Sequence, residues 1–244
     1  MPHNPVASSE LFAGHSANGG YGDAVEEIDW STGEILQALD SLGIDEQTLV
    51  VFTSDNGASS RWGGSNAPLS GFKGSTMEGG MRVPFIVRWP GSVPIGTSRD
   101  DLASTIDLLP TFSRLAGAAV PAKGIIDGRD IWPLLSGDTQ AKSPHEAFFY
   151  YYRDQLQAIR VDRWKLHLER QVDSGQGMET IALRLYDLKS DVGETTDLKI
   201  DHPDVVKRLL SLADQAREDL GDGRRKGLNQ RPAGYVVNPV TLTE

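Results

Sequence analysis

Apolar residues in the first part of the chain recur at three- and four-residue spacings. Between Gly22 and Gly43 they are Val25, Ile28, Ile35, Leu36, Leu39 and Leu42. Acidic residues occupy the first turn of this segment, where the helix dipole favours negative charge, and Gly43 follows the last apolar position. The pattern predicts an amphipathic helix over residues 22–43.

Two apolar runs without alternation come next, Thr48–Thr53 and Val83–Trp89. Such runs are typical of strands buried on both faces of a parallel sheet. The segment between them, residues 58–81, is rich in Gly and Ser and has no periodicity, and loops of this length are usually functional or mobile. A second helix is expected over residues 108–116, with Asp107 as its N-cap.

The pattern changes near residue 138. Four short β-rich runs separated by turn residues predict an antiparallel meander, at residues 146–152, 155–161, 164–168 and 182–188. A last helix is expected over residues 203–220, followed by a loosely held tail. We therefore predict an α/β fold: a mixed sheet flanked by helices in residues 1–137, then a small α+β domain with an antiparallel sheet in residues 138–244.

The amino-acid composition excludes several classes of function. Thirty-four acidic and 24 basic residues give a formal net charge of −10, which argues against nucleic acid as a partner. The chain has no cysteine, so it offers neither disulfides nor a thiolate nucleophile. No apolar stretch reaches the roughly 18 residues of a membrane span, and no targeting signal is visible, so the compartment stays open.

Asp55 and Asn56 stand where the first predicted strand ends. Ligands gather at the carboxyl ends of strands in open α/β sheets, and two neighbouring oxygen donors there could begin a site for a hard divalent cation. Calcium needs about six to eight oxygens, so other ligands would have to come from elsewhere. The alternative is a plain turn, because Asp-Asn-Gly is a common way to end a strand.

Lys73 lies between glycines in the segment Gly71–Thr76, where the backbone could approach a bound anion closely. Such a loop could hold sulfate or phosphate, although it lacks the spacing of a nucleotide-binding loop. The alternative is a solvated lysine. For Glu78 and Arg82, which follow in the same loop, we expect an internal ion pair.

His3 is a candidate acid, base or anion donor, because imidazole titrates near neutrality. A lone histidine near a terminus can equally have no role. The other four histidines show no metal-binding spacing and are interpreted as surface or packing residues. The run Tyr150–Tyr152 fits alternation in a strand, and we interpret it as packing.

Taken together, these segments resemble the type I, formylglycine-dependent sulfatases of the alkaline phosphatase superfamily. The match begins with Met1–His3 and residues 20–23, and continues through residues 49–57 (LVVFTSDNG) and 72–84 (FKGSTMEGGMRVP). Residues 104–111, 127–130 and 185–188 follow in the family's order. The resemblance implies an alkaline phosphatase-like fold and hydrolysis of sulfate esters at a calcium-bound site.

The resemblance also implies roles for individual residues. Asp55 and Asn56 match two of the metal ligands, with Asn56 close to the sulfate. Lys73 matches the lysine that binds a sulfate oxygen and can protonate the leaving group, and His3 matches a histidine with a similar role. The implied substrate is a sulfated small molecule or glycan, and resembling enzymes are often periplasmic or secreted.

One departure from the family is clear. The family's nucleophile motif, a Cys or Ser followed by any residue, Pro, a small residue and Arg, does not occur in this sequence. We therefore interpret the chain as the C-terminal portion of a sulfatase, which could associate through an exposed sheet edge. Two alternatives remain: a catalytically inactive anion-binding or assembly fragment, and a phosphoester hydrolase of the same superfamily.

Overall fold

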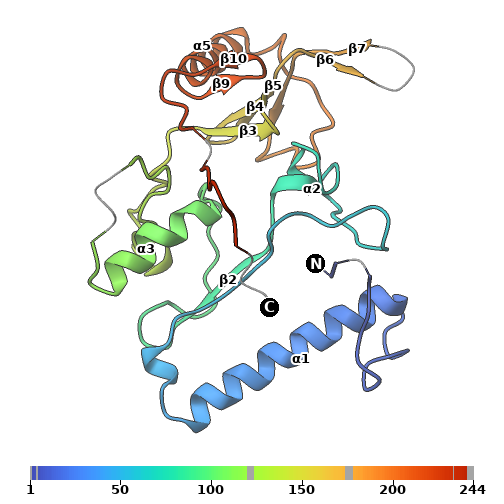
Figure 1. Cartoon of the computed structure of the whole chain (residues 1–244), viewed down its shortest axis with the longest axis vertical. Coiled ribbons are helices and arrows are strands. Elements are labelled where there is room, and N and C mark those ends of the chain that lie inside the picture. Colours follow the sequence, from blue (N-terminus) through green and yellow to red (C-terminus); the bar gives the residue numbers. More distant parts are fainter. Residues whose placement is uncertain (1, 4, 120–123, 174–177, 233, 241–244) are drawn as a thin grey trace.

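The computed structural model describes residues 2–3, 5–119, 124–173, 178–232 and 234–240. Helix α1 (Gly19–Ser41) lies at one end of the molecule, and helix α5 (Pro203–Asp219) lies at the opposite end (Figure 1). None of the helices in the described ranges is long and apolar enough to cross a membrane.

Helix α1 confirms the first predicted helix but begins before Gly22. Asp23 therefore falls beyond the first turn, where it is buried and accepts the backbone N–H groups of Gly14 and Ser16 at 2.9 and 2.7 Å. These hydrogen bonds lower the pKa of the Asp23 carboxyl. The apolar face is partly open, because Val25 and Ile35 are exposed.

The two predicted strands form, as β1 (Val50–Thr53) and β2 (Phe85–Arg88), but they pair antiparallel, with Val50 opposite Arg88. The expected burial on both faces is also wrong for these strands in the described residues. Every residue of β1 is only partly buried, and Phe85 and Ile86 are exposed. The reason is that the described part of the chain gives each strand one partner.

The segment between β1 and β2 is a long loop, as expected, and contains one short helix, α2 (Glu78–Met81). After β2 come a 3-10 turn, η2 (Thr105–Asp107), then α3 (Leu108–Leu115) and α4 (Trp132–Leu135). Asp107 is the N-cap residue of α3, as predicted, but its side chain makes no capping hydrogen bond to this helix. Its buried side chain instead accepts the N–H groups of Ser104 and Arg129 and contacts His145 Nε2 at 2.8 Å.

The antiparallel meander is confirmed. Its strands lie in the order β3-β4-β5-β8, with β3 at Phe148–Tyr152, β4 at Gln155–Val161, β5 at Trp164–His167 and β8 at Arg184–Asp187. The main apolar core lies between this sheet and α5 and includes Leu156, Ile159 and Leu166 from the sheet and Leu209 and Ala213 from the helix.

A hairpin that the sequence pattern does not predict is formed by β6 (Arg170–Asp173) and β7 (Met178–Ile181). The start of the tail is also more ordered than expected, because β9 (Gly221–Asp222) pairs with β10 (Arg225–Lys226). Residues 241–244 of the predicted second domain lie outside the described residues, as does Met1. The boundary at residues 137 and 138 stays a prediction.

Candidate active site

Asp55 and Asn56 follow the end of β1 after one intervening residue, Ser54, close to where the sequence predicts them. Asp55 is exposed and Asn56 is partly buried. Backbone hydrogen bonds fix the turn that carries them: the N–H of Gly57 donates to the carbonyl of Gly80 at 3.1 Å. The turn is thus held against α2 through the third residue of this short helix.

Glycine permits this close contact between the turn and α2. A Cβ atom added to Gly57 would lie 1.8 Å from the carbonyl oxygen of Gly79, and one added to Gly79 would lie 2.4 Å from the carbonyl oxygen of Gly71. Only a residue without a side chain allows the backbones to approach this closely. The glycines around α2 therefore set the position of the Asp55–Asn56 turn.

Lys73 lies on the loop beside the same turn. Its backbone N–H donates to the carbonyl of Ala58 at 3.0 Å, and its side chain is exposed. Asn66 joins the two segments, because its amide accepts the N–H of Ala58 at 2.8 Å and donates to the carbonyl of Gly71 at 3.0 Å. The structure therefore brings the backbone of Lys73 next to the segment that carries Asn56.

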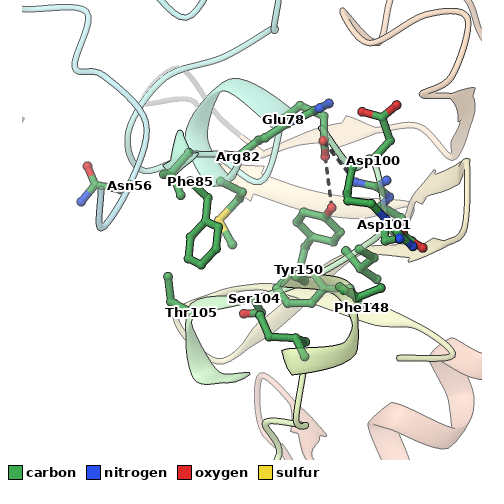
Figure 2. A pocket seen from close by; sticks show the side chains of 18 of the residues that line it. Asn56, Glu78, Arg82, Phe85, Asp100, Asp101, Ser104, Thr105, Phe148 and Tyr150 are labelled. Carbon is green, nitrogen blue, oxygen red and sulfur yellow. Dashed lines mark hydrogen bonds and ion pairs between the residues drawn. The ribbon is translucent and has the colours of Figure 1, made fainter. Parts of the chain in front are cut away.

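A cavity of about 460 Å³ opens beside Asp55 and Asn56. Arg82, Phe85, Ser104 and Phe148 are among the residues that line it. Figure 2 shows Asn56 at its edge and a hydrogen bond between Glu78 and Tyr150 in its wall. His3 and Lys73 are not among the described residues that line this cavity, and His3 is exposed.

The predicted ion pair between Glu78 and Arg82 is wrong. Glu78 is buried, and its Oε1 atom lies 2.9 Å from Lys165 Nζ and 3.1 Å from the Tyr150 hydroxyl. Lys165 Nζ also lies 2.9 Å from Oε1 of buried Glu194. The carboxylate of Glu78 therefore bonds across to the antiparallel sheet rather than within its own loop.

The predicted surface or packing role fits His202 but gives an incomplete description of His167. His202 packs on Trp164, with ring centroids 4.6 Å apart, whereas buried His167 contacts Glu194 Oε1 through Nε2 at 2.7 Å. Burial lowers the pKa of His167, although the hydrogen bond with Glu194 acts in the opposite direction and raises it. Hydrogen bonds from His167 and from Lys165 outweigh the effect of burial on Glu194 and lower its pKa.

A weak sequence signal for this cluster was present. Lys165 and His167 alternate with Trp164, Leu166 and Leu168, which places the two polar residues on one face of β5. Alternation alone predicts that such a face is solvated. In the structure it packs against the loop that carries α2, so both side chains are buried.

Asp55 and Asn56 are the two predicted metal ligands of this site. The oxygen donors of Asp55 and Asn56 suit a hard cation, but the described residues contain no group of three or more His, Cys, Asp or Glu side chains that could hold a metal. Two residues cannot provide the six to eight oxygens that calcium takes. No catalytic step through calcium follows from these residues.

Two sequence families match the chain. The family described as Sulfatase matches residues 2–118, and the one described as N-sulphoglucosamine sulphohydrolase, C-terminal, matches residues 73–219. The motif order, the turn after β1 and the two family matches together define an α/β protein of the sulfatase type. The chain belongs to the sulfatase family.

Known proteins agree with this assignment. The chain is 50% identical over 157 residues to steryl-sulfatase of Mus musculus, covering 61% of this chain and 25% of the relative. It is 34% identical over 269 residues to N-acetylgalactosamine-6-sulfatase of Sus scrofa, covering 98% of this chain and 50% of the relative. The chain therefore spans between a quarter and a half of these relatives.

A solved structure shows the same fold. The crystal structure of Ps i-CgsB in complex with k-i-k-neocarrahexaose matches with a TM-score of 0.76 and 28% sequence identity, covering 88% of this chain and 48% of that chain. The expectation of an alkaline phosphatase-like fold with an antiparallel sheet and a C-terminal helix is thereby confirmed.

Proposed function

We propose that this chain supplies part of the active site of a sulfatase that hydrolyses sulfate esters. The observation that carries the proposal is the joining of the Asp55–Asn56 turn to the Lys73 loop through two backbone hydrogen bonds, Gly57 to Gly80 and Lys73 to Ala58. These bonds join the backbone segments that carry Lys73, the candidate anion-binding cation, and Asp55 and Asn56, the candidate oxygen donors. Family membership makes sulfate the expected anion.

Each site residue has a role that its chemistry allows. The ammonium of Lys73 would bind a sulfate oxygen and give a proton to the leaving alcohol, while the amide of Asn56 would donate to the sulfate. His3 would act as a second donor at the leaving group. Negative charge develops on these oxygens in the transition state, and fixed donors stabilise it there.

The remaining parts of the reaction lie outside this sequence. Asp55 and Asn56 would contribute oxygen ligands to the family's calcium, whose other ligands the described residues do not provide. The residue that becomes formylglycine would also have to come from outside, because the chain contains neither cysteine nor the serine version of the motif. We therefore expect no turnover from the 244 residues alone.

The substrate class is a sulfated small molecule or glycan. The cavity beside Asn56 combines Arg82 with the rings of Phe85 and Phe148, so it offers both a cation and apolar walls. The similar structure of Ps i-CgsB is a complex with k-i-k-neocarrahexaose, which supports a glycan as the substrate class. All the reported relatives are sulfatases, so neither a phosphoester substrate nor a role in binding or assembly alone is favoured.

Turnover of two fluorogenic esters tests the proposal. The 244-residue chain and a version extended to include a sulfatase nucleophile motif are assayed with calcium on 4-methylumbelliferyl sulfate and on the matching phosphate. We expect hydrolysis of the sulfate by the extended form only. Faster release from the phosphate, or turnover by the 244 residues alone, would contradict the proposal.

A further inference from the structure

We propose that Lys165 and Glu194 are positioning residues, which hold the anion site in place from the antiparallel sheet and the loop after it. The inference deepens the proposed function and rests on it for the identity of the anion. Its structural basis is the buried charge cluster made of Glu78, Tyr150, Arg160, Lys165, His167 and Glu194. This cluster touches the loop that carries α2 on one side and strands β3, β4 and β5 on the other.

Lys165 is the centre of the cluster. Its side chain is fully buried, and Nζ lies 2.9 Å from Glu78 Oε1 and 2.9 Å from Glu194 Oε1. Nζ also lies 4.2 Å from the centre of the Tyr150 ring. The ammonium of Lys165 is buried and contacts two carboxylates and an aromatic ring. These contacts restrict its position, so Lys165 fixes the distance between Glu78 and Glu194.

Glu194 reaches the loop from the opposite direction. Its Oε2 atom accepts the backbone N–H of Glu78 at 2.6 Å, at the first residue of α2. Glu194 itself has a φ of 54°, an uncommon backbone conformation for a residue other than glycine. Its contacts with Lys165, His167 and Glu78 explain why this conformation persists.

The restraint passes to the anion site through two short steps. Glu78 begins the helix that contains Gly80, and the carbonyl of Gly80 accepts the N–H of Gly57, next to Asn56. A second link lies nearby, because the hydroxyl of Thr76 donates to buried Gln157 on β4 at 3.0 Å. Both ends of the segment that follows Lys73 are therefore tied to the cluster or to the sheet.

The negative charges of the cluster are matched by an equal number of positive charges, so the loss of any one of them leaves a charge without its partner. The carboxylates of Glu78 and Glu194 face the cations Lys165 and Arg160, whose NH1 atom lies 3.7 Å from Glu78 Oε2. Removing Lys165 leaves Glu78 with Arg160 and the Tyr150 hydroxyl, and Glu194 with His167 and the N–H of Glu78. Arg160 is then the one full cation of this cluster for two buried carboxylates, and buried charges that lose their cation move apart or reach for water. The segment free to move is the loop, because the sheet is held by the core.

Hydrogen exchange on the 244-residue chain tests this positioning role without turnover. The probes are the amides of Gly57 and Lys73, which report the site, and those of Ile159 and Leu209, which report the core. The variants are Lys165→Met and the milder Glu194→Gln. The control is Lys199→Met, which breaks the exposed pair of Lys199 with Asp197.

We expect exchange at Gly57 and Lys73 to become at least about ten-fold faster in Lys165→Met and in Glu194→Gln, with core amides unchanged and Lys199→Met like the parent chain. Uniform acceleration at the site and the core would overturn the inference, as would no change at the site. If Lys165→Met does not fold, the exchange rates of Glu194→Gln at Gly57 and Lys73 decide whether the inference holds. In an extended form with turnover, Lys165→Met should lower kcat/KM for 4-methylumbelliferyl sulfate by about 10- to 100-fold.

The two sets of results separate the two proposals. Loss of local protection without any sulfatase turnover in the extended form would support the positioning role and reject the proposed function. Turnover that Lys165→Met leaves unchanged would reject the positioning role and keep the proposed function.

Discussion

The backbone N–H of Gly57 donates to the carbonyl of Gly80 at 3.1 Å, which joins the turn after β1 to α2. This contact depends on the missing side chain of Gly57, because a Cβ atom there would meet the carbonyl oxygen of Gly79 at 1.8 Å. We expect Gly57→Ala to lower the free energy of unfolding by about 1–3 kcal/mol, measured by urea denaturation.

Gly33→Ala is the matched control, because nothing lies within 4 Å of a Cβ atom at that position inside α1. Alanine suits a helix better than glycine, so this variant should be more stable by roughly 0.5–1 kcal/mol. Equal effects from the two substitutions would show that the turn is not closely packed against α2.

Asp107 connects three separate segments of the chain through its side chain. Its fully buried carboxylate accepts the N–H groups of Ser104 and Arg129 and contacts His145. Asp107→Ala leaves these donors without an acceptor, and we expect a loss of about 3–5 kcal/mol in thermal or urea unfolding. Asp29→Ala, on the exposed surface of α1, should change stability by less than about 0.5 kcal/mol. A similar, small effect at both positions would refute this role of Asp107.

Stability should fall between pH 7.5 and 5.5 because of His167. Burial, helped by Lys165 and Arg170 and opposed by Glu194, lowers its pKa from the ordinary value of 6.5. The unfolded chain then binds a proton before the folded chain does, so the stabilisation is complete above pH 6.5 and is lost as the pH falls through the folded pKa. Carboxylates such as Asp187, whose hydrogen bond with Arg163 lowers its pKa to about 2, titrate below this window.

Urea midpoints at pH 7.5 and 5.5 measure this effect. The parent chain should lose stability over the interval, and His167→Gln, which cannot titrate, should lose less of it. An identical pH dependence in the two proteins would assign the effect to another group.

The chain should associate with itself through β2. Ile86 is 61% exposed, and β2 has one strand partner in the described residues, so an open edge and an apolar surface coincide. We expect apparent mass to rise with concentration in sedimentation experiments, and Ile86→Lys to reduce this rise. Ile95→Lys, at a fully exposed loop position, is the control and should leave association unchanged. Equal association in both variants would place the contact elsewhere.

The sequence predicted the elements whose pattern is local. The short β-rich runs at residues 155–161 and 164–168, each bounded by turn residues, predicted strands of the meander, and both strands form and pair. The antiparallel direction of β2 relative to β1 was not predicted, because an apolar run indicates a strand but does not indicate the direction in which the strand pairs. The hairpin β6–β7 was missed because its residues are mixed and largely polar.

The positions of the candidate residues were predicted where these residues are adjacent in the sequence, and contacts between residues far apart in the sequence were missed. Asp55 and Asn56 follow a strand, and that position is readable from the chain. The partner of Glu78 was assigned to nearby Arg82, whereas Lys165 is 87 positions away. Sequence separation hides such pairs, because only packing of the sheet against the loop brings them together.

The most direct test of the account is the effect of Lys73→Ala on an extended form that carries the nucleophile motif. The account predicts a fall in kcat/KM for 4-methylumbelliferyl sulfate of about 100-fold or more, because a cation that stabilises developing charge would be lost. Lys142→Ala, which removes a lysine from outside the loops described as the site, should retain the parent value. Unchanged kcat/KM in Lys73→Ala would contradict the assignment of this loop as the sulfate site.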